Sequence, residues 1–321
     1  MTKEDVGTVA IIGTGTIGAS WACLFLAHGV DVIATDIRKG ADVELRATVD
    51  RIWPSLPEDV LKHGRRGTLR FETNLAEACK AADFVQENAI ERLDAKIELM
   101  QHIDAATPPG VVIASSSSAI SVSDMQSACA HPERIVLGHP FNPPHLVPLV
   151  ELVGGEKTDE VYLTKAEQFY TQMGKVPVRL QSEIYGHIAN RMQAAIFREA
   201  IHLLESGVAS AEDIDRAVSE GPGLRWALMG PLLTYRLAGG DAGMQGFWDM
   251  FAPMQDKLWS DLGTPVPDAA LQTRVTDAVE QAYGDRCIRD LVKNRDRLLQ
   301  AVIAAKSSQK KDQSRCAPRK S

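Results

Sequence analysis

The first half of the chain alternates short extended patterns with stretches of helical periodicity. The extended patterns, most of them apolar and β-branched as in buried strands, occupy residues 8–12, 30–35, 69–72, 83–87, 111–114 and 135–138. Between them, apolar residues recur at helical spacing over 19–29, 41–63, 75–81 and 93–105. Strands that alternate with helices in this way predict an α/β domain with a doubly wound parallel sheet.

The second half of the chain has helical periodicity alone. Residues 183–211 predict one long helix after a domain junction, Gly221 to Trp226 predicts a loop, and Pro231 predicts the start of another helix. Residues 306–321 are basic and almost without apolar side chains, so they cannot bury enough surface to offset their ordering entropy. We therefore expect an α/β domain over 1–183, an all-α domain over 184–305 and a disordered tail over 306–321.

The composition is that of an ordinary globular protein and argues against several classes. Of the 321 residues, 45% are hydrophobic and 24% are charged, and the net charge is −7, so binding to nucleic acid is not expected. No apolar run approaches the roughly 20 residues that cross a bilayer, and the N-terminus lacks a signal-peptide pattern. The five cysteines are scattered without a CxxC pair, which predicts free thiols in the cytoplasm and no metal site.

A glycine-rich loop joins the first predicted strand to the first predicted helix. Its first glycine permits a tight turn, the second lets the backbone approach a pyrophosphate, and the third lets helix and strand pack closely. The helix N-terminus favours the phosphates, and an acid at the end of the next strand can bind the ribose hydroxyls. This Rossmann pattern predicts NAD rather than NADP, although Arg38 could soften that preference; the alternative is a chance glycine pattern in an ordinary βαβ unit. The predicted cofactor residues are Gly13, Thr14, Gly15, Thr16, Ile17, Gly18 and Asp36.

A histidine and a glutamate follow the last predicted strand of this domain. The prolines of His139-Pro140-Phe141-Asn142-Pro143-Pro144 predict a stiff loop that holds His139 and Asn142. Glu151 lies in an otherwise apolar extended segment, where a carboxylate needs a partner, and His139 is the obvious candidate. Such a pair suits alcohol oxidation, with the histidine as base. The alternative is a purely structural hydrogen bond.

These motifs together resemble the 3-hydroxyacyl-CoA dehydrogenase family. They are GTGTIG, ENAIERLDAK, the serine run 115–118, GHPFNPP followed by Glu151, and YGHIANR. The resemblance implies an NAD-dependent dehydrogenase of L-3-hydroxy compounds with a Rossmann domain and a helical domain that binds substrate and forms a homodimer. It implies His139 as the catalytic base and Glu151 as its partner. Because four serines stand in a row, the assignment of Ser117 as the functional serine is uncertain by one residue. The remaining implied residues are Ser117 and Asn190 at the substrate oxygen, and Glu91, Lys96 and Asn142 on the nucleotide side.

The segment after the second strand departs from the members that use CoA. They carry serine and lysine contacts to CoA there, whereas GADVELRATVDRIWPSLPEDVLKHG has no lysine before Lys62. The resemblance therefore favours a branch acting on small free hydroxy acids, either L-carnitine or L-gulonate. Six of the 18 aromatic residues lie between residues 221 and 259, and aromatic faces recognise a quaternary ammonium. For most of these six, however, packing in the core or in a dimer interface is the better explanation.

By position, the resemblance to the L-carnitine branch implies a set of substrate residues. A free carboxylate also needs a cationic partner, for which Arg191 and Arg225 are equal candidates. The expected reaction is oxidation of L-carnitine to 3-dehydrocarnitine; the alternatives are oxidation of L-gulonate, oxidation of an L-3-hydroxyacyl-CoA, and a non-catalytic, crystallin-like role. The implied substrate residues are Phe141, Gly186, Ile188, Ala189, Gly221 and Phe251.

Overall fold

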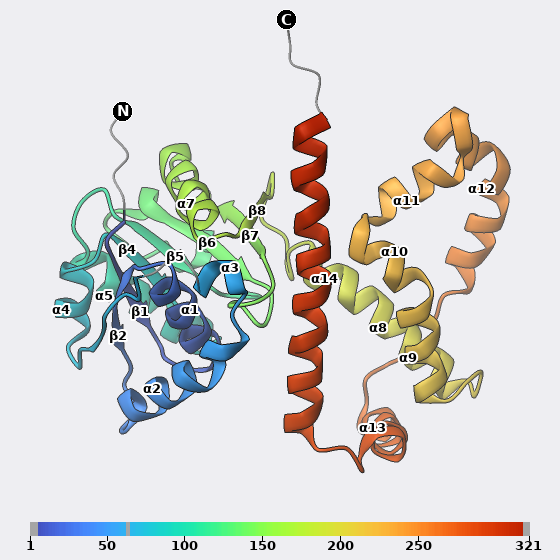
Figure 1. The fold of residues 1–321 in the computed structure, drawn as a ribbon, viewed down its shortest axis with the longest axis horizontal. Helices are drawn as coiled ribbons and strands as arrows, with labels where there is room; N and C mark the ends of the chain where they lie inside the picture. Colours follow the sequence, from blue (N-terminus) through green and yellow to red (C-terminus); the bar gives the residue numbers. More distant parts are fainter. Residues whose placement is uncertain (1–5, 62–64, 317–321) are drawn as a thin grey trace, which may run out of the picture. The chain divides into compact units, whose positions relative to one another are not determined.

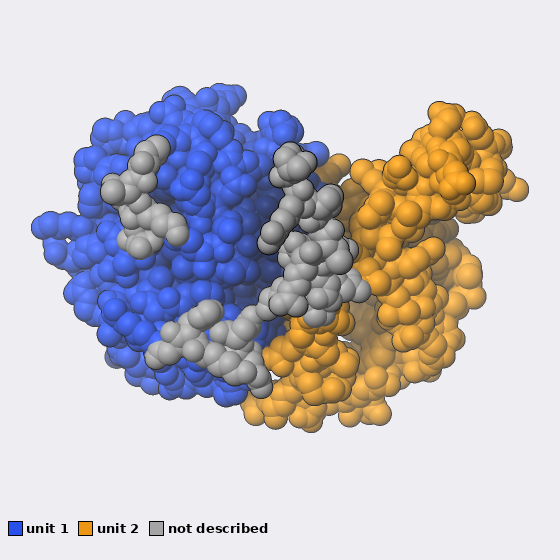
Figure 2. Space-filling view, turned by 45° about the horizontal axis from the view of Figure 1, so that its top comes forward, with its two compact units in different colours: residues 1–190 blue, residues 191–321 orange. Residues whose placement is uncertain are grey.

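The computed structural model describes residues 6–61 and 65–316. The chain forms two compact units, residues 1–190 and residues 191–321, which Figure 2 colours separately. The boundary expected from the sequence, between residues 183 and 184, falls inside the first unit near its end.

The first unit is built on one eight-stranded sheet in the order β3-β2-β1-β4-β5-β6-β7-β8 (Figure 1). All neighbouring strands are parallel except β6 and β7, which are antiparallel. The doubly wound α/β fold predicted from the sequence is confirmed. The strands are β1 Thr8–Ile12, β2 Asp31–Thr35, β3 Leu69–Phe71, β4 Phe84–Glu87, β5 Val112–Ser115, β6 Ile135–Pro140, β7 Leu149–Gly154 and β8 Val176–Arg179.

Helices cover both faces of this sheet and enclose two apolar cores. One core joins α1 and α7 to the sheet through Trp21, Phe25, Phe84, Phe169 and Tyr170, whose rings contact one another. The other core lies under α4, α5 and α6. Because both faces are buried at the centre of the sheet, the central strands such as β1 and β5 are mostly apolar. The helices are α1 Thr16–Ala27, α2 Ala41–Ile52, α3 Glu58–Leu61, α4 Leu75–Lys80, α5 Leu93–Ala106, α6 Val122–Met125 and α7 Glu160–Gln172.

Strand β6 is longer than the sequence pattern predicts. His139 belongs to the strand and not to the proline-rich loop, so the expectation that the loop holds it is wrong. The reason is that β7 turns back antiparallel beside β6 and continues its ladder, pairing His139 with Glu151 directly. The pairing brings the two side chains together through sheet register.

The second unit is helical, as predicted, with different helix boundaries. Helix α8 starts at Ala189 and not at residue 183, because Gly186 and His187 adopt left-handed backbone angles that a helix excludes. Pro222 begins a helix where a loop was expected, and α14 continues to Cys316 where the sequence predicts a disordered tail from residue 306; residues 317–321 lie outside the described residues. The helices are α8 Ala189–Glu205, α9 Ala211–Glu220, α10 Pro222–Leu228, α11 Pro231–Ala238, α12 Gly243–Asp261, α13 Ala269–Tyr283 and α14 Ile288–Cys316.

The described part of the chain offers no candidate membrane span and no candidate metal cluster. None of their helices is both long and apolar enough to cross a membrane. None of their histidine, cysteine, aspartate and glutamate side chains forms a group of three or more that could hold a metal ion.

Candidate active site

The glycine loop between β1 and α1 is shaped to admit a phosphate. A Cβ on Gly13, whose φ is 85°, would lie 2.9 Å from the Asn88 backbone, and a Cβ on Gly18 would lie 2.0 Å from the Gly13 carbonyl oxygen. A Cβ on Gly15 would meet nothing within 4 Å among the described residues. Gly13 and Gly18 therefore serve the turn and the packing, whereas Gly15 leaves open space before α1. No side chain of the described part caps this helix, so its first N–H groups can bind a pyrophosphate.

Asp36 directly follows β2 and lies beside this loop. Its Oδ2 accepts hydrogen bonds from the backbone and hydroxyl of Thr14, both at 2.8 Å, and its Oδ1 accepts from the Arg38 backbone at 2.9 Å. Burial opposes ionisation, but these bonds outweigh it and hold the pKa of Asp36 below its usual value. Arg38 pairs with both Asp36 and Glu44, so its charge is shared between two carboxylates. An ionised carboxylate here can accept hydrogen bonds from a ribose diol and would repel a 2′-phosphate, and the role of Asp36 in cofactor choice stays a prediction.

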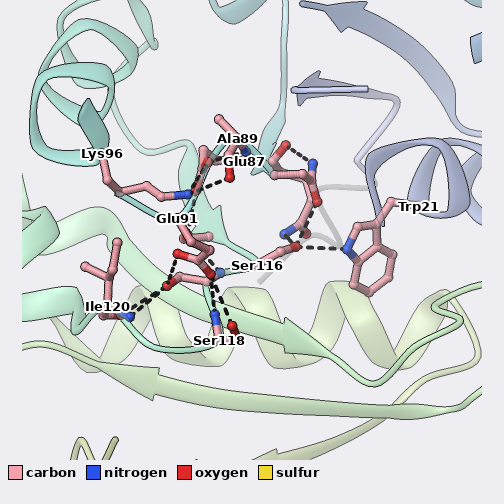
Figure 3. Close-up of polar contacts among 12 residues, drawn as sticks. Trp21, Glu87, Ala89, Glu91, Lys96, Ser116, Ser118 and Ile120 are labelled. Atoms are coloured by element: carbon pink, nitrogen blue, oxygen red, sulfur yellow. Dashed lines mark hydrogen bonds and ion pairs between the residues drawn. The ribbon is translucent and has the colours of Figure 1, made fainter. Parts of the chain in front are cut away.

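A buried ion pair underlies the loop after β4. Lys96 on α5 reaches Glu87, with Nζ 2.7 Å from Oε1, and its Nζ also donates to the Ala89 carbonyl at 3.1 Å (Figure 3). Ser115 donates to the other Glu87 oxygen at 2.6 Å. Both members of the pair are almost fully buried, so Lys96 fixes the path of the loop that carries Glu91. Its predicted contact with the nucleotide stays a prediction.

The serine run at the end of β5 divides into two pairs by its partners. Ser115 and Ser116 bind the β4 side, the latter donating to Asn88 at 2.8 Å and accepting from the Trp21 indole at 3.1 Å. Ser117 and Ser118 both bind Glu91: the Ser117 hydroxyl donates to Oε2 at 2.9 Å and the Ser118 amide donates to Oε1 at 2.6 Å. Ser117 is also nearly fully buried. The structure thus groups Ser117 with Glu91, two of the predicted site residues.

His139 and Glu151 form a buried pair across β6 and β7. His139 Nδ1 lies 3.0 Å from Glu151 Oε2, and the side chains are 7% and 2% exposed. A carboxylate can only accept, so Nδ1 carries the proton and the lone pair is on Nε2. Glu151 Oε1 accepts from the amides of Ile188 and Ala189, at 2.8 and 3.0 Å. Burial opposes its ionisation, yet the bonds from His139 and these two amides hold the pKa of Glu151 below its usual value.

The sequence reasoning missed one residue of this group, His187. Its ring centroid lies 4.8 Å from that of His139, and its Nε2 lies 3.2 Å from the Ser117 carbonyl oxygen. The signal was present, because His187 stands between Gly186 and Ile188, both predicted to contact substrate. Asn190 follows at the start of α8 and is half-buried. Asn142 is exposed and Phe141 half-buried just after β6.

The remaining predicted residues belong to the second unit. Gly221 lies at the junction of α9 and α10, and Arg225 lies on α10. Phe251 lies on α12 with its ring centroid 5.4 Å from that of Phe247, which also contacts Tyr235 and Trp248. The aromatic residues noted in the sequence therefore pack largely on one another within this unit.

Comparison with known proteins identifies the same two-part organisation. Residues 8–184 match the model of the 3-hydroxyacyl-CoA dehydrogenase NAD-binding domain, and residues 186–269 match the C-terminal domain of that family. The chain is 46% identical over 303 residues to an L-carnitine dehydrogenase of Streptomyces coelicolor, covering 94% of this chain and 95% of the relative. It is 43% identical to one of Pseudomonas aeruginosa, covering 94% of each.

Solved structures share the fold. A 5-formyl-3-hydroxy-2-methylpyridine 4-carboxylic acid 5-dehydrogenase, described as an NAD⁺-dependent dismutase, superposes with a TM-score of 0.80 at 28% identity, over 94% of this chain and 99% of that one. A (S)-3-hydroxybutyryl-CoA dehydrogenase from Ralstonia eutropha gives 0.59 at 30% identity, over 77% and 89%.

Proposed function

The chain belongs to the 3-hydroxyacyl-CoA dehydrogenase family, and on that premise we propose that it oxidises L-carnitine to 3-dehydrocarnitine. It is an NAD-dependent 3-hydroxy dehydrogenase. The observation that carries the choice of substrate is the group of L-carnitine dehydrogenases with which it shares 41–46% identity over nearly its whole length. Proteins that share a fold can act on different substrates. Sequence similarity over both domains therefore supports the choice of L-carnitine better than the Rossmann fold alone.

His139 is the base in the proposed mechanism. Its Nε2 lone pair accepts the proton of the C3 hydroxyl, and the ionised Glu151 on Nδ1 stabilises the imidazolium that forms. Ser117 and Asn190 hold the substrate oxygen at that proton. The Gly13–Gly18 loop, Asp36, Glu91, Lys96 and Asn142 would hold NAD, which would supply the acceptor for the hydride of C3.

The quaternary ammonium of the substrate requires an apolar, aromatic part of the site. A trimethylammonium group has no N–H to donate, so aromatic faces recognise it, at about 0.5–2 kcal/mol each. The family resemblance assigns these faces to Phe141 and Phe251, and it assigns the room for the methyl groups to Gly186 and Gly221. Ile188 and Ala189 complete the apolar lining, which fits poorly with the many hydroxyls of L-gulonate.

The proposed assembly is a homodimer formed through the second unit. Its helices expose large apolar side chains, among them Leu232 at 77%, Leu237 at 56% and Trp259 at 60%. Monomers rarely leave so much apolar surface uncovered, and a second copy is the common partner. The proposed compartment is the cytoplasm, which agrees with the free thiols of Cys23, Cys79, Cys129 and Cys287.

The proposal is tested by NADH formation with the purified protein. L-carnitine, D-carnitine, L-gulonate and L-3-hydroxybutyryl-CoA are run side by side, and the expected result is a clear preference for L-carnitine. Preference for L-gulonate or the CoA ester would leave the proposed role of His139 intact but would contradict recognition of a quaternary ammonium. Bound NADH without turnover of any of the four would favour the non-catalytic role.

A further inference from the structure

The turn before α8 has an unusual backbone. Gly186 and His187 are consecutive residues with positive φ, at 76° and 52°, and His187 is the one non-glycine residue with positive φ in the described chain. A side chain with a Cβ is strained in that region, and such strain persists where the surrounding structure enforces it. The turn aims the amides of Ile188 and Ala189 at Glu151 Oε1. Its geometry therefore serves the carboxylate of the dyad.

The His187 ring binds the rest of the group. It is 4% exposed and packs at 48° to the His139 ring, with centroids 4.8 Å apart. Its Nε2 faces the Ser117 carbonyl oxygen at 3.2 Å, and because a carbonyl only accepts, Nε2 carries the proton. Its Nδ1 is then a lone pair, buried and without a hydrogen-bond partner among the described residues. A phenylalanine would pack as well without leaving a polar atom unsatisfied.

The surrounding charges favour the uncharged form of this ring. The titratable groups that face it are His139 on β6, Glu151 on β7 and Glu91 before α5. Burial, and after it the charge of His139, lower the pKa of His187 below its usual value. The hydrogen bond to the Ser117 carbonyl and the two carboxylates oppose this lowering only in part. The surroundings of His187 therefore favour its neutral form when His139 carries a charge.

We propose that His187 is a positioning residue of the His139–Glu151 pair. Its uncharged ring packs on the His139 imidazole and is itself anchored to the Ser117 carbonyl, and its left-handed turn holds Glu151 through two amides. His187 stays neutral while His139 carries the substrate proton, so the base gains its charge beside a polar ring and not beside a second cation. This inference rests on the proposed function of His139.

Two variants of the full chain separate the parts of this role. His187→Phe keeps the packing and removes the N–H to Ser117, whereas His187→Gln restores an N–H of similar reach. We expect kcat with L-carnitine to fall about 30-fold in His187→Phe, since a misplaced reacting group can cost up to about 100-fold, and to recover to within about fivefold in His187→Gln. KM for NAD should stay within about twofold in both. His28→Phe is the matched control, because His28 also bonds a carbonyl, that of Leu24, and lies outside the site.

Nitrogen NMR of the unmodified protein tests the same proposal without turnover. The expected spectrum at pH 7.5 has His187 neutral with the proton on Nε2 and His139 with the proton on Nδ1, the signals being assigned from their loss in His187→Gln and His139→Ala. A doubly protonated His187, a proton on its Nδ1, or an unchanged kcat in His187→Phe would overturn the proposal. If His187→Phe does not fold, the spectrum and the glutamine variant decide. Absence of L-carnitine turnover in the unmodified protein would instead overturn the proposed function and leave the spectrum to judge His187.

Discussion

The two units of this chain bury their side chains in opposite ways. The first unit encloses two apolar cores and also buries polar pairs such as Lys96–Glu87 and His139–Glu151. In the described part of the second unit, the only large apolar side chains that are buried are those of Ile214, Phe247 and Leu271. Many other large apolar side chains of this unit are exposed. A complete core can hold charged groups in fixed geometry, since each has its partner within the unit. The exposed apolar side chains of the second unit instead need another protein surface to cover them.

The largest expected effect separates the chemistry of the first unit from its cofactor binding. His139→Ala removes the proposed base, so kcat for L-carnitine should fall at least about 1,000-fold. NADH binding, followed by fluorescence, should stay within about twofold because the glycine loop is untouched. Turnover within about tenfold of the unmodified protein would show that another group takes the proton.

The next effect concerns the exposed apolar face of the second unit. Leu232→Asp combined with Leu237→Asp puts two charges on α11, where both leucines are mostly exposed. The dimer dissociation constant should rise at least about 100-fold, because an unpaired charge buried in an interface is costly. Sedimentation velocity over a concentration series measures it.

The control for this change lies in the first unit. Val43→Asp alters a residue of α2 that is 67% exposed and should leave the dimer intact. A monomeric unmodified protein at micromolar concentration, or a dimeric double variant, would contradict the idea that the second unit needs a partner.

A smaller effect sharpens the account of the nucleotide site. Asp36→Ala removes the carboxylate that fits a ribose diol and repels a 2′-phosphate. The ratio of kcat/KM for NAD to that for NADP should fall about 10- to 100-fold. Glu77→Ala on α4 is the charge-matched control. An unchanged ratio in Asp36→Ala would remove Asp36 from cofactor selection.

The smallest effect tests how the complete core treats a single buried charge. Lys175 donates to the carbonyls of Pro144 and Val147, and burial lowers its pKa from 10.5 to about 7. Between these values the unfolded chain binds the extra proton, so the free energy of unfolding rises with pH. From pH 7.5 to 8.5 the rise is about 1 kcal/mol.

Urea unfolding at the two pH values measures this slope. In Lys175→Met, the rise in the free energy of unfolding between the two pH values should be smaller by about 1 kcal/mol. An equal rise in both proteins would show that Lys175 keeps its proton when folded.

Much of the first unit could be predicted from the sequence because its signals are local. The β-branched runs, the GTGTIG loop and Asp36 each depend on residues a few positions apart, and the structure places strands β1, β2, β4 and β5 within a residue or so of the predicted runs. The helix boundaries of the second unit were less predictable. Two consecutive left-handed residues, Gly186 and His187, moved the start of α8. Pro222 began a helix where Gly221 and Gly223 indicated a loop.

The sequence by itself determined the cofactor class, the fold of the first unit and the identity of the histidine and glutamate. Only the tertiary structure decided how they meet. The antiparallel register of β6 and β7 sets His139 beside Glu151, and the turn at Gly186 and His187 brings two amides to the same carboxylate. The place of His187 in this group could be recognised only from the tertiary structure, because its contacts with His139 and Ser117 join residues that are far apart in the sequence. Local patterns encode strands and turns, whereas a contact between distant segments depends on the register in which the whole sheet closes.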